Sequence, residues 1–530
     1  MVRYNRRTPR WTFALVSAGG VMMTLDVTVV NVALSGIARD LQTGLGPVQW
    51  TVSAYSLAFG ALLLTAGALS DRIGRRTVFT AGMGLFTLAS AACGLAPDIG
   101  TLIAARAAQG LGGAMVFAPT LALLAAAYEG ARRQAAIAAF AAIASAAGAL
   151  GPVVGGAFVQ GLGWRWIFLV NVPIGVLVVA GALARMPESA PPRALGRRLD
   201  PLGAVLGVGA LLALHYPLVT GAEVGWTAPE VLLSAAVGGV LAVALVVSQR
   251  RGDGLIDMTL LRIRMFSGAA VLGFLARLSS LGVLAFLTLW LQSTHAYSPL
   301  EVGLSLLPLT GSLLVAGLFV ARLQKTFSAG ALVSAGFAAQ GLGLLGLAAA
   351  GAVDSGGTGA GRTATVAGLV LLGVGGAVIF PPLMGVAVSA VPTDRAGMAS
   401  GLTNACYPLG TATGVAVFGA LFSARLGAGL GAEAEAGAGA AGLGAGVGGA
   451  GGEGGVTSLR EAVGTGRFEL VDPVLLPLAR SAFSGAFTAV CLASALVCLL
   501  GVVAARALGP GAQAVGGTTK RPRSRIAQPS

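Results

Sequence analysis

Residues 67–76 read Gly-Ala-Leu-Ser-Asp-Arg-Ile-Gly-Arg-Arg and connect two apolar runs, 49–69 and 77–96. Each run is about 20 residues long, which is enough for an α-helix to cross the hydrocarbon core of a bilayer. Four charged residues occupy the short connection, while the flanking runs are nearly uncharged. This stretch therefore predicts two neighbouring membrane-spanning helices joined by a charged turn.

The same alternation of apolar runs and short polar turns continues along the whole chain. Of the 530 residues 55% are hydrophobic and only 10% are charged, whereas a soluble globular chain carries about 25% charged residues. The runs are continuously apolar rather than alternating, which favours helices over a β-barrel. We therefore expect an all-α membrane protein with fourteen spans, at 12–34, 49–69, 77–96, 102–127, 136–160, 166–185, 201–219, 231–248, 267–291, 303–322, 329–350, 364–388, 401–425 and 482–507.

The placement of basic residues predicts how the spans are oriented. With a cytoplasmic N-terminus, most of the 34 lysines and arginines fall in cytoplasmic segments, as the positive-inside rule requires. We expect a multi-pass protein of the cell (inner or plasma) membrane with both termini cytoplasmic. The net charge of +14 is explained by these loops, so no nucleic-acid partner is expected. The external basic residues would be Arg39, Arg165, Arg362, Arg425, Arg460, Arg467 and Arg480.

Connectors rich in Pro, Gly or charge divide the chain. A Pro- and Arg-rich connector at 186–200 and a charged connector at 249–266 enclose only two spans. Residues 427–455 are almost all Gly and Ala, which predicts a flexible external loop. The expected domains are an N-terminal six-helix bundle at 1–200, two inserted helices at 201–250 and a C-terminal six-helix bundle at 251–530.

Charged residues inside predicted spans are the strongest functional candidates. Asp26 lies in the first span, where a carboxylate is costly unless it is neutralised or paired. Arg106 lies in the fourth span at a depth compatible with contact with Asp26. A protonatable carboxylate is what proton coupling requires, so Asp26 and Arg106 are the candidate coupling residues. The alternative is a structural ion pair without a transport role.

The turn at 67–76 also carries a specific motif, because glycines flank an Asp-Arg pair. A simple positive-inside anchor would not need those glycines. The turn resembles the signature loop of the major facilitator superfamily, in which the aspartate locks two halves of the protein at their cytoplasmic faces. The resemblance implies a partner for Asp71 near residues 395–400. It also implies a cytoplasmic gate made of Gly67, Asp71, Arg72, Gly74, Arg75 and Arg76.

The corresponding loop after the tenth span, at 321–325, departs from this pattern. It lacks both the aspartate and the glycine of the signature. We therefore expect the locking role to rest mainly on Asp71.

The fifth span contains a second motif, Gly148-Ala-Leu-Gly151-Pro152-Val-Val-Gly155-Gly156. Proline bends a helix, and glycines four residues apart let another helix approach closely. This run resembles the antiporter signature of the superfamily. Together with the first span around Asp26 and the segment 164–175, it resembles the fourteen-span drug:proton antiporter family. The aromatic residues of 164–175 also fit an interfacial belt.

The resemblance implies a major facilitator fold, with fourteen transmembrane helices as two six-helix bundles plus two extra helices. It also implies a role for Arg106 in proton transfer. A central cavity is expected between the bundles, lined by Asn31, Trp50, Tyr55, Gln109 and Arg277. Arg277, a permanent cation in the ninth span, would attract an anionic or polar substrate there. Its alternative is to reach the membrane surface or pair with a backbone carbonyl.

The expected function is proton-coupled efflux of small amphipathic organic compounds, such as drugs or antibiotics, by alternating access. The sequence has no phosphate-binding G-x-x-x-x-G-K-[ST] run and no catalytic constellation, so neither ATP use nor an enzyme is expected. The isolated cysteines and histidines indicate no metal, and no cofactor is expected. The expected partners are a small-molecule substrate, protons and the lipid bilayer, with a monomeric protein. Two alternatives are a dedicated exporter of a single natural product or metabolite and a non-transporting membrane sensor.

Overall fold

The computed structural model describes residues 8–188, 200–250, 258–353, 359–392, 395–441 and 462–506. Over these ranges the chain is almost entirely α-helical and contains no strand. Fourteen helical segments of the described chain are long and apolar enough to cross a membrane. All fourteen predicted spans are confirmed in number and order.

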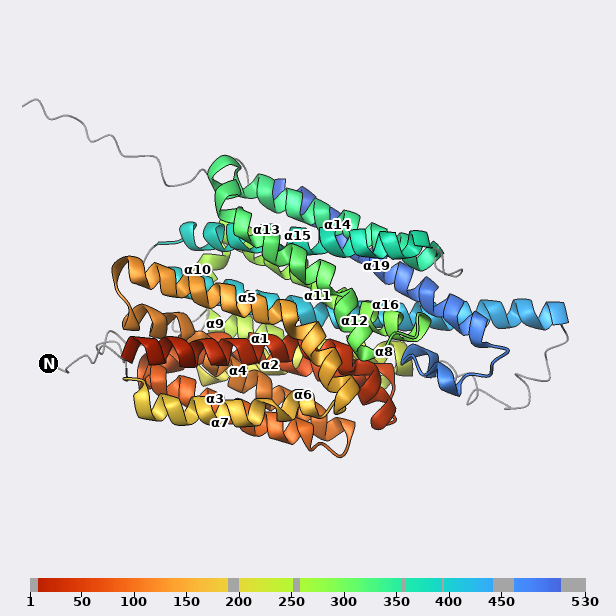
Figure 1. Ribbon diagram of the computed structural model, residues 1–530, viewed down its shortest axis with the longest axis horizontal. Helices are drawn as coiled ribbons and strands as arrows, with labels where there is room; N and C mark the ends of the chain where they lie inside the picture. The colour runs from red at the N-terminus through yellow and green to blue at the C-terminus, as the bar shows by residue number, and fades with distance from the viewer. Residues whose placement is uncertain are drawn as a thin grey trace, which may run out of the picture.

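The first helices of the chain pack into one group, here called the N-terminal bundle (Figure 1). In it α4 packs against α2 and α3, α5 packs against α1, and α7 packs against α3. The bundle comprises α1 (Thr8–Asp40), α2 (Leu45–Ile73), α3 (Arg75–Gly94), α4 (Ile99–Ala127), α5 (Gly130–Gly161), α6 (Trp166–Leu169) and α7 (Asn171–Arg185).

The later helices form a second group, the C-terminal bundle, coloured green to blue in Figure 1. Here α14 packs against α15 and α19, α11 against α16 and α19, and α13 against α15. Its elements are α10 (Met258–Leu261), α11 (Arg264–Thr294), α12 (Pro299–Ser305), α13 (Leu307–Thr326), α14 (Ala329–Val353), α15 (Gly359–Ser389), α16 (Ala396–Ala441), the 3₁₀ turn η3 (Phe468–Leu470) and α19 (Leu476–Arg506).

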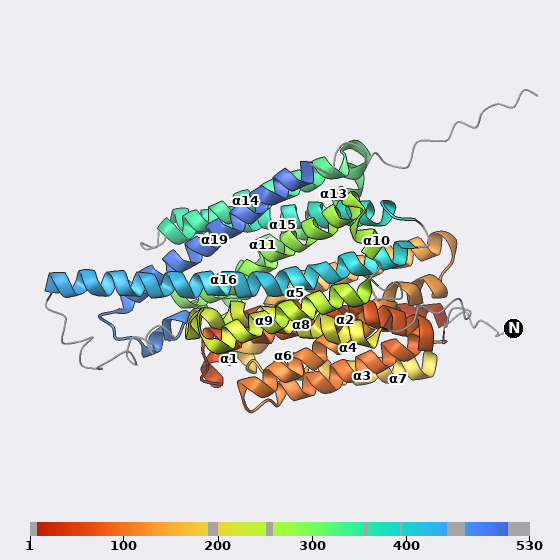
Figure 2. The same cartoon turned by 180° about the vertical axis from the view of Figure 1, so that it is seen from behind.

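The two inserted helices are α8 (Pro201–Val224) and α9 (Pro229–Gln249), which pack against each other. Figure 2 shows them along one side of the molecule. α8 contacts both α2 and α16, one helix from each bundle. The inserted pair therefore lies across the boundary between the bundles.

Two predicted spans are interrupted where proline enters. The span at 166–185 is divided at Val170 into α6 and α7, just before Pro173. The span at 303–322 is divided at Leu306 into α12 and α13, just before Pro308. Proline lacks the N–H group that would donate to the carbonyl four residues earlier in the helix. The missing hydrogen bond explains why each helix is interrupted just before its proline.

The Gly- and Ala-rich segment differs from the sequence-based expectation. α16 does not end at its membrane span but continues as a helix to Ala441, and both figures show it projecting beyond its neighbours. The prediction of a flexible loop is wrong for residues 427–441, because alanine has the highest intrinsic helix propensity and here extends an existing helix. The remainder of the predicted loop, 442–455, lies outside the described residues.

The N-terminal bundle has two ends, and we name each end after an aspartate in one of its turns. The Asp71 end carries the α2–α3 turn, and the Asp98 end carries the α3–α4 turn. At the latter, the backbone N–H of Thr101 donates to Asp98 Oδ1 at 2.8 Å and its hydroxyl donates to Oδ2. These hydrogen bonds hold the pKa of Asp98 below its usual value. Asp98 is thus the N-cap that starts α4.

Candidate functional site

Asp26 on α1 and Arg106 on α4 form a buried ion pair. Arg106 Nη1 lies 2.5 Å from Asp26 Oδ2, and each side chain is 1% exposed. The two residues are 80 positions apart in sequence, and helix packing brings them together. The structure therefore joins the two charged residues that the sequence placed at similar depth.

Arg106 also has partners other than Asp26. Its Nε donates to the carbonyl oxygen of Thr51 at 2.9 Å, and Nη1 donates to Gln109 Oε1 at 2.6 Å. The guanidinium carbon lies 4.4 Å from the ring centroid of Tyr55 and 5.6 Å from that of Phe168. Hydrogen bonds and aromatic faces both favour a buried guanidinium. Arg106 is held from several sides.

Gln109 links this pair to a wider polar network. Its Nε2 donates to Asp26 Oδ1 and to Ser90 Oγ, both at 2.9 Å. Asn171 Nδ2 also donates to Ser90 Oγ, at 3.1 Å. The network therefore joins α1, α3, α4 and α7, and it holds both oxygens of Asp26.

Protonation of Asp26 would change the balance of charge in this network. The ion pair is neutral as a whole when both groups are charged. A proton on Asp26 would leave Arg106 as a buried cation with the neutral acceptors Thr51 and Gln109. Because an uncompensated buried charge is strongly destabilising, packing around Arg106 would have to adjust. The packing around Arg106 thus depends on the charge of Asp26.

Gln109→Ala is expected to destabilise the folded protein. It removes hydrogen bonds to both members of the ion pair, and hydrogen bonds to charged groups contribute about 1.5–3 kcal/mol each. A lower midpoint of thermal unfolding in detergent would show the effect. Gln134→Ala, on the exposed face of α5, is the matched control and should leave the midpoint within error. Equal midpoints for both variants would contradict the assigned network.

The other predicted cavity residues lie in four different places. Tyr55 belongs to the network around Arg106. Asn31 is buried beside α11, where its backbone carbonyl accepts a hydrogen bond from Thr288 Oγ1 at 2.9 Å. Trp50 packs edge-on against His215 of the inserted helix α8, with 4.9 Å between ring centroids. Arg277 lies in the C-terminal bundle, so these residues do not form one cluster.

The glycines of the fifth-span motif provide close contacts between helices. Gly148, Gly151 and Gly155 face Thr24, Thr28 and Val29 of α1. A Cβ atom on Gly155 would lie 2.8 Å from Val29 Cγ1, which is too close for a side chain. These three glycines therefore let α5 pack tightly on α1 within the N-terminal bundle.

Gly156 and Pro152 instead contact the C-terminal bundle. A Cβ atom on Gly156 would lie 2.8 Å from Leu300 Cα, at the start of α12. The reciprocal contact is equally close, because a Cβ atom on Gly303 of α12 would lie 2.8 Å from the carbonyl carbon of Pro152. The motif thus forms part of the contact between the two bundles.

Further contacts join the bundles at the Asp98 end. Ser35 on α1 donates to Gln292 Oε1 on α11, and Gln292 Nε2 donates to the carbonyl of Val32 at 3.0 Å. The backbone N–H of Leu300 donates to Gln160 Oε1 on α5 at 3.3 Å. The bundles are therefore tied together at this end by hydrogen bonds as well as by glycine packing.

At the Asp71 end the predicted gate residues have local partners. The ion pair of Asp71 within the described chain is with Arg75 at 3.4 Å, and the Asp71 side chain is 63% exposed. Arg395, the first residue of the expected partner segment, donates to Thr259 Oγ1 at 2.9 Å. A Cβ atom on Gly67 would meet no neighbouring atom within 4 Å, and Arg72 is exposed. The implied contact between Asp71 and residues 395–400 is absent among the described residues.

Glu188, which the sequence analysis did not single out, holds the same turn in place. Its carboxylate accepts hydrogen bonds from the backbone N–H groups of Arg76 and Thr77, at 3.0 and 3.2 Å, and so caps the start of α3. Arg76 Nη2 donates to the carbonyl of Leu183 at 2.8 Å. Gly74 has φ +113°, and a Cβ there would lie 2.6 Å from the Glu188 carboxyl carbon. The turn therefore requires glycine at this position.

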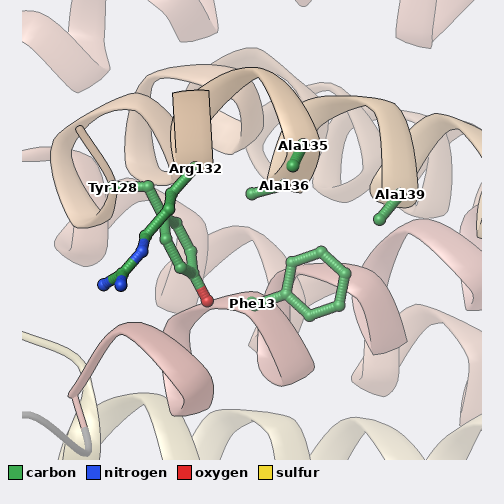
Figure 3. Close-up of a pocket in the computed structure, with 6 residues that line it drawn as sticks. All are labelled: Phe13, Tyr128, Arg132, Ala135, Ala136 and Ala139. Atoms are coloured by element: carbon green, nitrogen blue, oxygen red, sulfur yellow. The ribbon is translucent and has the colours of Figure 1, made fainter. Parts of the chain in front are cut away.

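A surface pocket of about 310 Å³ lies between α1 and α5 at the Asp71 end (Figure 3). Alanines and Phe13 form most of its wall, and Tyr128 donates a hydrogen bond to the carbonyl of Pro9 at its edge. It shares no lining residue with the Asp26 network. The pocket is therefore separate from the candidate site. Its lining residues are Phe13, Tyr128, Arg132, Ala135, Ala136 and Ala139.

Comparisons with known proteins indicate a single protein family. Residues 16–415 match the family model described as Major Facilitator Superfamily. The chain is 38% identical over 426 residues to the multidrug resistance protein Stp of Mycobacterium tuberculosis. The aligned region covers 80% of this chain and 77% of that protein. It is 36% identical over 408 residues to the methylenomycin A resistance protein of Streptomyces coelicolor, and this aligned region covers 77% of this chain and 84% of that protein.

Two further similarities extend this result. The tetracenomycin C resistance and export protein of Streptomyces glaucescens is 34% identical over 424 residues, covering 80% of this chain and 77% of that protein. A solved structure of a bacterial homologue of the human lysosomal transporter Spinster, in an inward-facing and occupied conformation, matches with a TM-score of 0.66 at 14% identity. It covers 95% of this chain and 97% of that chain. At this identity the likeness shows a common fold.

Proposed function

Because the chain belongs to the major facilitator superfamily, we propose that it exports small amphipathic organic compounds in exchange for protons. It is a multi-pass membrane transporter rather than an enzyme. The relatives described above are named for resistance to drugs or antibiotics, which supports export over uptake. The expected compounds are accordingly drug-like or antibiotic-like.

The buried Asp26–Arg106 pair is the observation that carries the proton-coupling part of this proposal. It provides one protonatable group inside the membrane-spanning region and one permanent cation whose environment depends on that proton. Uptake of a proton by Asp26 would favour one arrangement of the bundles. Release of the proton would restore the ion pair and favour the other.

Alternating access would move the two bundles against each other. In support, the bundles are tied at the Asp98 end, while Asp71 pairs locally at the opposite end. We propose that residues 1–200 and 251–530 are the moving parts, with 201–250 alongside them. The protein would lie in the cell membrane with the Asp71 end and both termini on the cytoplasmic side. Asp71 would contact residues 395–400 in a second state, in which the bundles separate at the Asp98 end and meet at the Asp71 end.

Transport in inside-out membrane vesicles tests the proposal. With an acidic interior, vesicles containing the protein should accumulate a fluorescent amphipathic drug, and an ionophore that collapses the pH gradient should stop the accumulation. Vesicles prepared without the protein are the control. Accumulation that persists after the gradient is collapsed would exclude proton antiport.

A dedicated exporter of a single compound is the second candidate. Two of the similar proteins are each named for one antibiotic, methylenomycin A or tetracenomycin C, whereas Stp is named for multidrug resistance. A panel of chemically different compounds in the same vesicles separates these possibilities. Gradient-driven movement of one chemical type would favour the dedicated exporter.

A further inference from the structure

Arg277 differs from Arg106 in the partners that surround it. Both arginines lie well inside membrane-spanning helices. Arg106 is paired with Asp26 and hydrogen-bonded. The recorded partners of Arg277, within the described chain, are two aromatic rings: its guanidinium carbon lies 4.3 Å from the ring centroid of Phe380 and 6.0 Å from that of Tyr407. Arg277 Nε is buried without a hydrogen-bond acceptor.

This arrangement leaves a permanent positive charge only partly compensated. A guanidinium stays charged in proteins, and charged residues inside a membrane protein generally mark substrate or ion pathways. Aromatic faces attract the cation, but they accept no conventional hydrogen bond from its N–H groups. The side chain therefore retains donors for a further partner.

The surrounding residues form a small recognition cluster on three helices. Arg277 lies on α11, Phe380 on α15 and Tyr407 on α16, and the two rings meet edge-to-face with centroids 5.0 Å apart. The hydroxyl of Tyr407 is also buried without a hydrogen-bond partner. Two polar groups with unused hydrogen-bonding capacity thus lie beside aromatic surface.

Local sequence explains how the helices bring this cluster together. Pro381 and Pro382 follow Phe380 directly, and proline removes backbone hydrogen bonds and bends a helix. Gly410 lets α16 approach α11 closely, since a Cβ there would lie 3.2 Å from Arg277 Cβ. All three side chains of the cluster are half-buried, so each retains some accessible surface.

The cluster also lies on helices that meet the N-terminal bundle. α11 contacts α1, and α16 contacts α2. These are the helices whose relative positions would change if the bundles moved. A ligand held by the cluster would therefore be placed next to the moving boundary.

We infer that Arg277, Phe380 and Tyr407 form a substrate subsite for planar aromatic compounds that carry an anionic oxygen, such as a carboxylate or phenolate. The guanidinium would donate two hydrogen bonds to the anionic group, and the Tyr407 hydroxyl would donate a third. The aromatic rings would pack against the planar body of the compound. This inference rests on the proposed function, which makes the ligand a transported compound, and it predicts that anionic aromatics bind better than neutral or cationic ones.

Binding of a matched pair of probes tests the subsite. The purified full-length protein in lipid nanodiscs is titrated with fluorescent pyrene carboxylate and with its uncharged methyl ester. The wild-type protein should bind the acid at least about ten-fold more tightly than the ester, as expected when a charged hydrogen bond is lost. Arg277→Gln should bind the two probes alike, and Arg277→Lys should keep part of the preference.

Two further variants complete the design. Arg322→Gln removes an exposed arginine of the same bundle, whose guanidinium carbon lies 5.8 Å from the Phe319 ring centroid, and it should keep the wild-type preference. Tyr407→Phe removes a single hydroxyl and should weaken acid binding while leaving ester binding unchanged. It provides a second test if Arg277→Gln does not fold.

The inference is overturned if the wild-type protein binds the acid no better than the ester, or binds neither. It is equally overturned if the preference survives in Arg277→Gln or is unchanged in Tyr407→Phe. No pH gradient is present in this experiment, so its result is independent of proton coupling. A protein that prefers the acid here but fails the vesicle test would retain the subsite and lose the antiport mechanism.

Discussion

Asp26→Asn should reduce gradient-driven drug accumulation in inside-out vesicles to the level of vesicles lacking the protein. Asparagine has a similar shape but neither binds nor releases a proton at physiological pH. Residue 26 would therefore stay uncharged throughout the transport cycle. Substrate binding measured without a gradient should remain. Accumulation at the wild-type rate would exclude Asp26 as the coupling group.

The same substitution also affects folding, and the two effects must be separated. It leaves Arg106 as a buried cation without its carboxylate, and breaking a buried ion pair in this way costs about 3–5 kcal/mol. The double variant Asp26→Asn with Arg106→Gln removes both charges and should recover much of the thermal stability. It should still fail to transport. Recovery of transport with stability would show that the pair is structural.

Asp40→Asn is the matched control for this substitution. Asp40 lies at the end of the same helix and pairs with Arg165, but its side chain is 48% exposed. Exposed ion pairs contribute about 0–1 kcal/mol. The control variant should therefore fold and transport like the wild-type protein.

The contrast between Asp26 and its partners shows what the sequence could predict. The cost of a charge inside an apolar run is a local property, so Asp26 and Arg106 could be identified from their positions. Ser90 and Asn171 were missed because short polar side chains are common in apolar helices. Their importance depends on which residues of other helices they face. A polar residue within an apolar run was the available signal.

The fold shows the same division between local and long-range information. Fourteen spans follow from hydropathy, which each segment carries independently of its neighbours. The contact of Trp50 with His215 of the inserted pair was not foreseen, because the packing position of α8 cannot be read from its own sequence. The continuation of α16 to Ala441 was missed because a Gly- and Ala-rich composition is compatible with both a linker and a helix.

Gly156→Val should strongly impair transport by preventing the two bundles from meeting at the Asp98 end. The new side chain would have to occupy space now filled by the backbone of Pro299 and Leu300, and backbone cannot move aside as a flexible side chain can. Overpacking of this kind costs about 1–3 kcal/mol. If that cost applies to one state of the transporter, it shifts the balance between states roughly 5- to 150-fold.

The measurement that separates this effect from simple misfolding is accessibility at the Asp98 end. A cysteine introduced at Ser35, which hydrogen-bonds to Gln292 across the bundles, should react faster with a membrane-impermeant thiol reagent in the Gly156→Val background. Gly161→Val is the matched control, because this glycine lies on the same helix with no other atoms near its Cβ position. The control should transport normally and leave the labelling rate unchanged. Unchanged labelling with Gly156→Val would mean that the close approach of α5 and α12 does not hold this end shut, since the contact would have been broken without any opening.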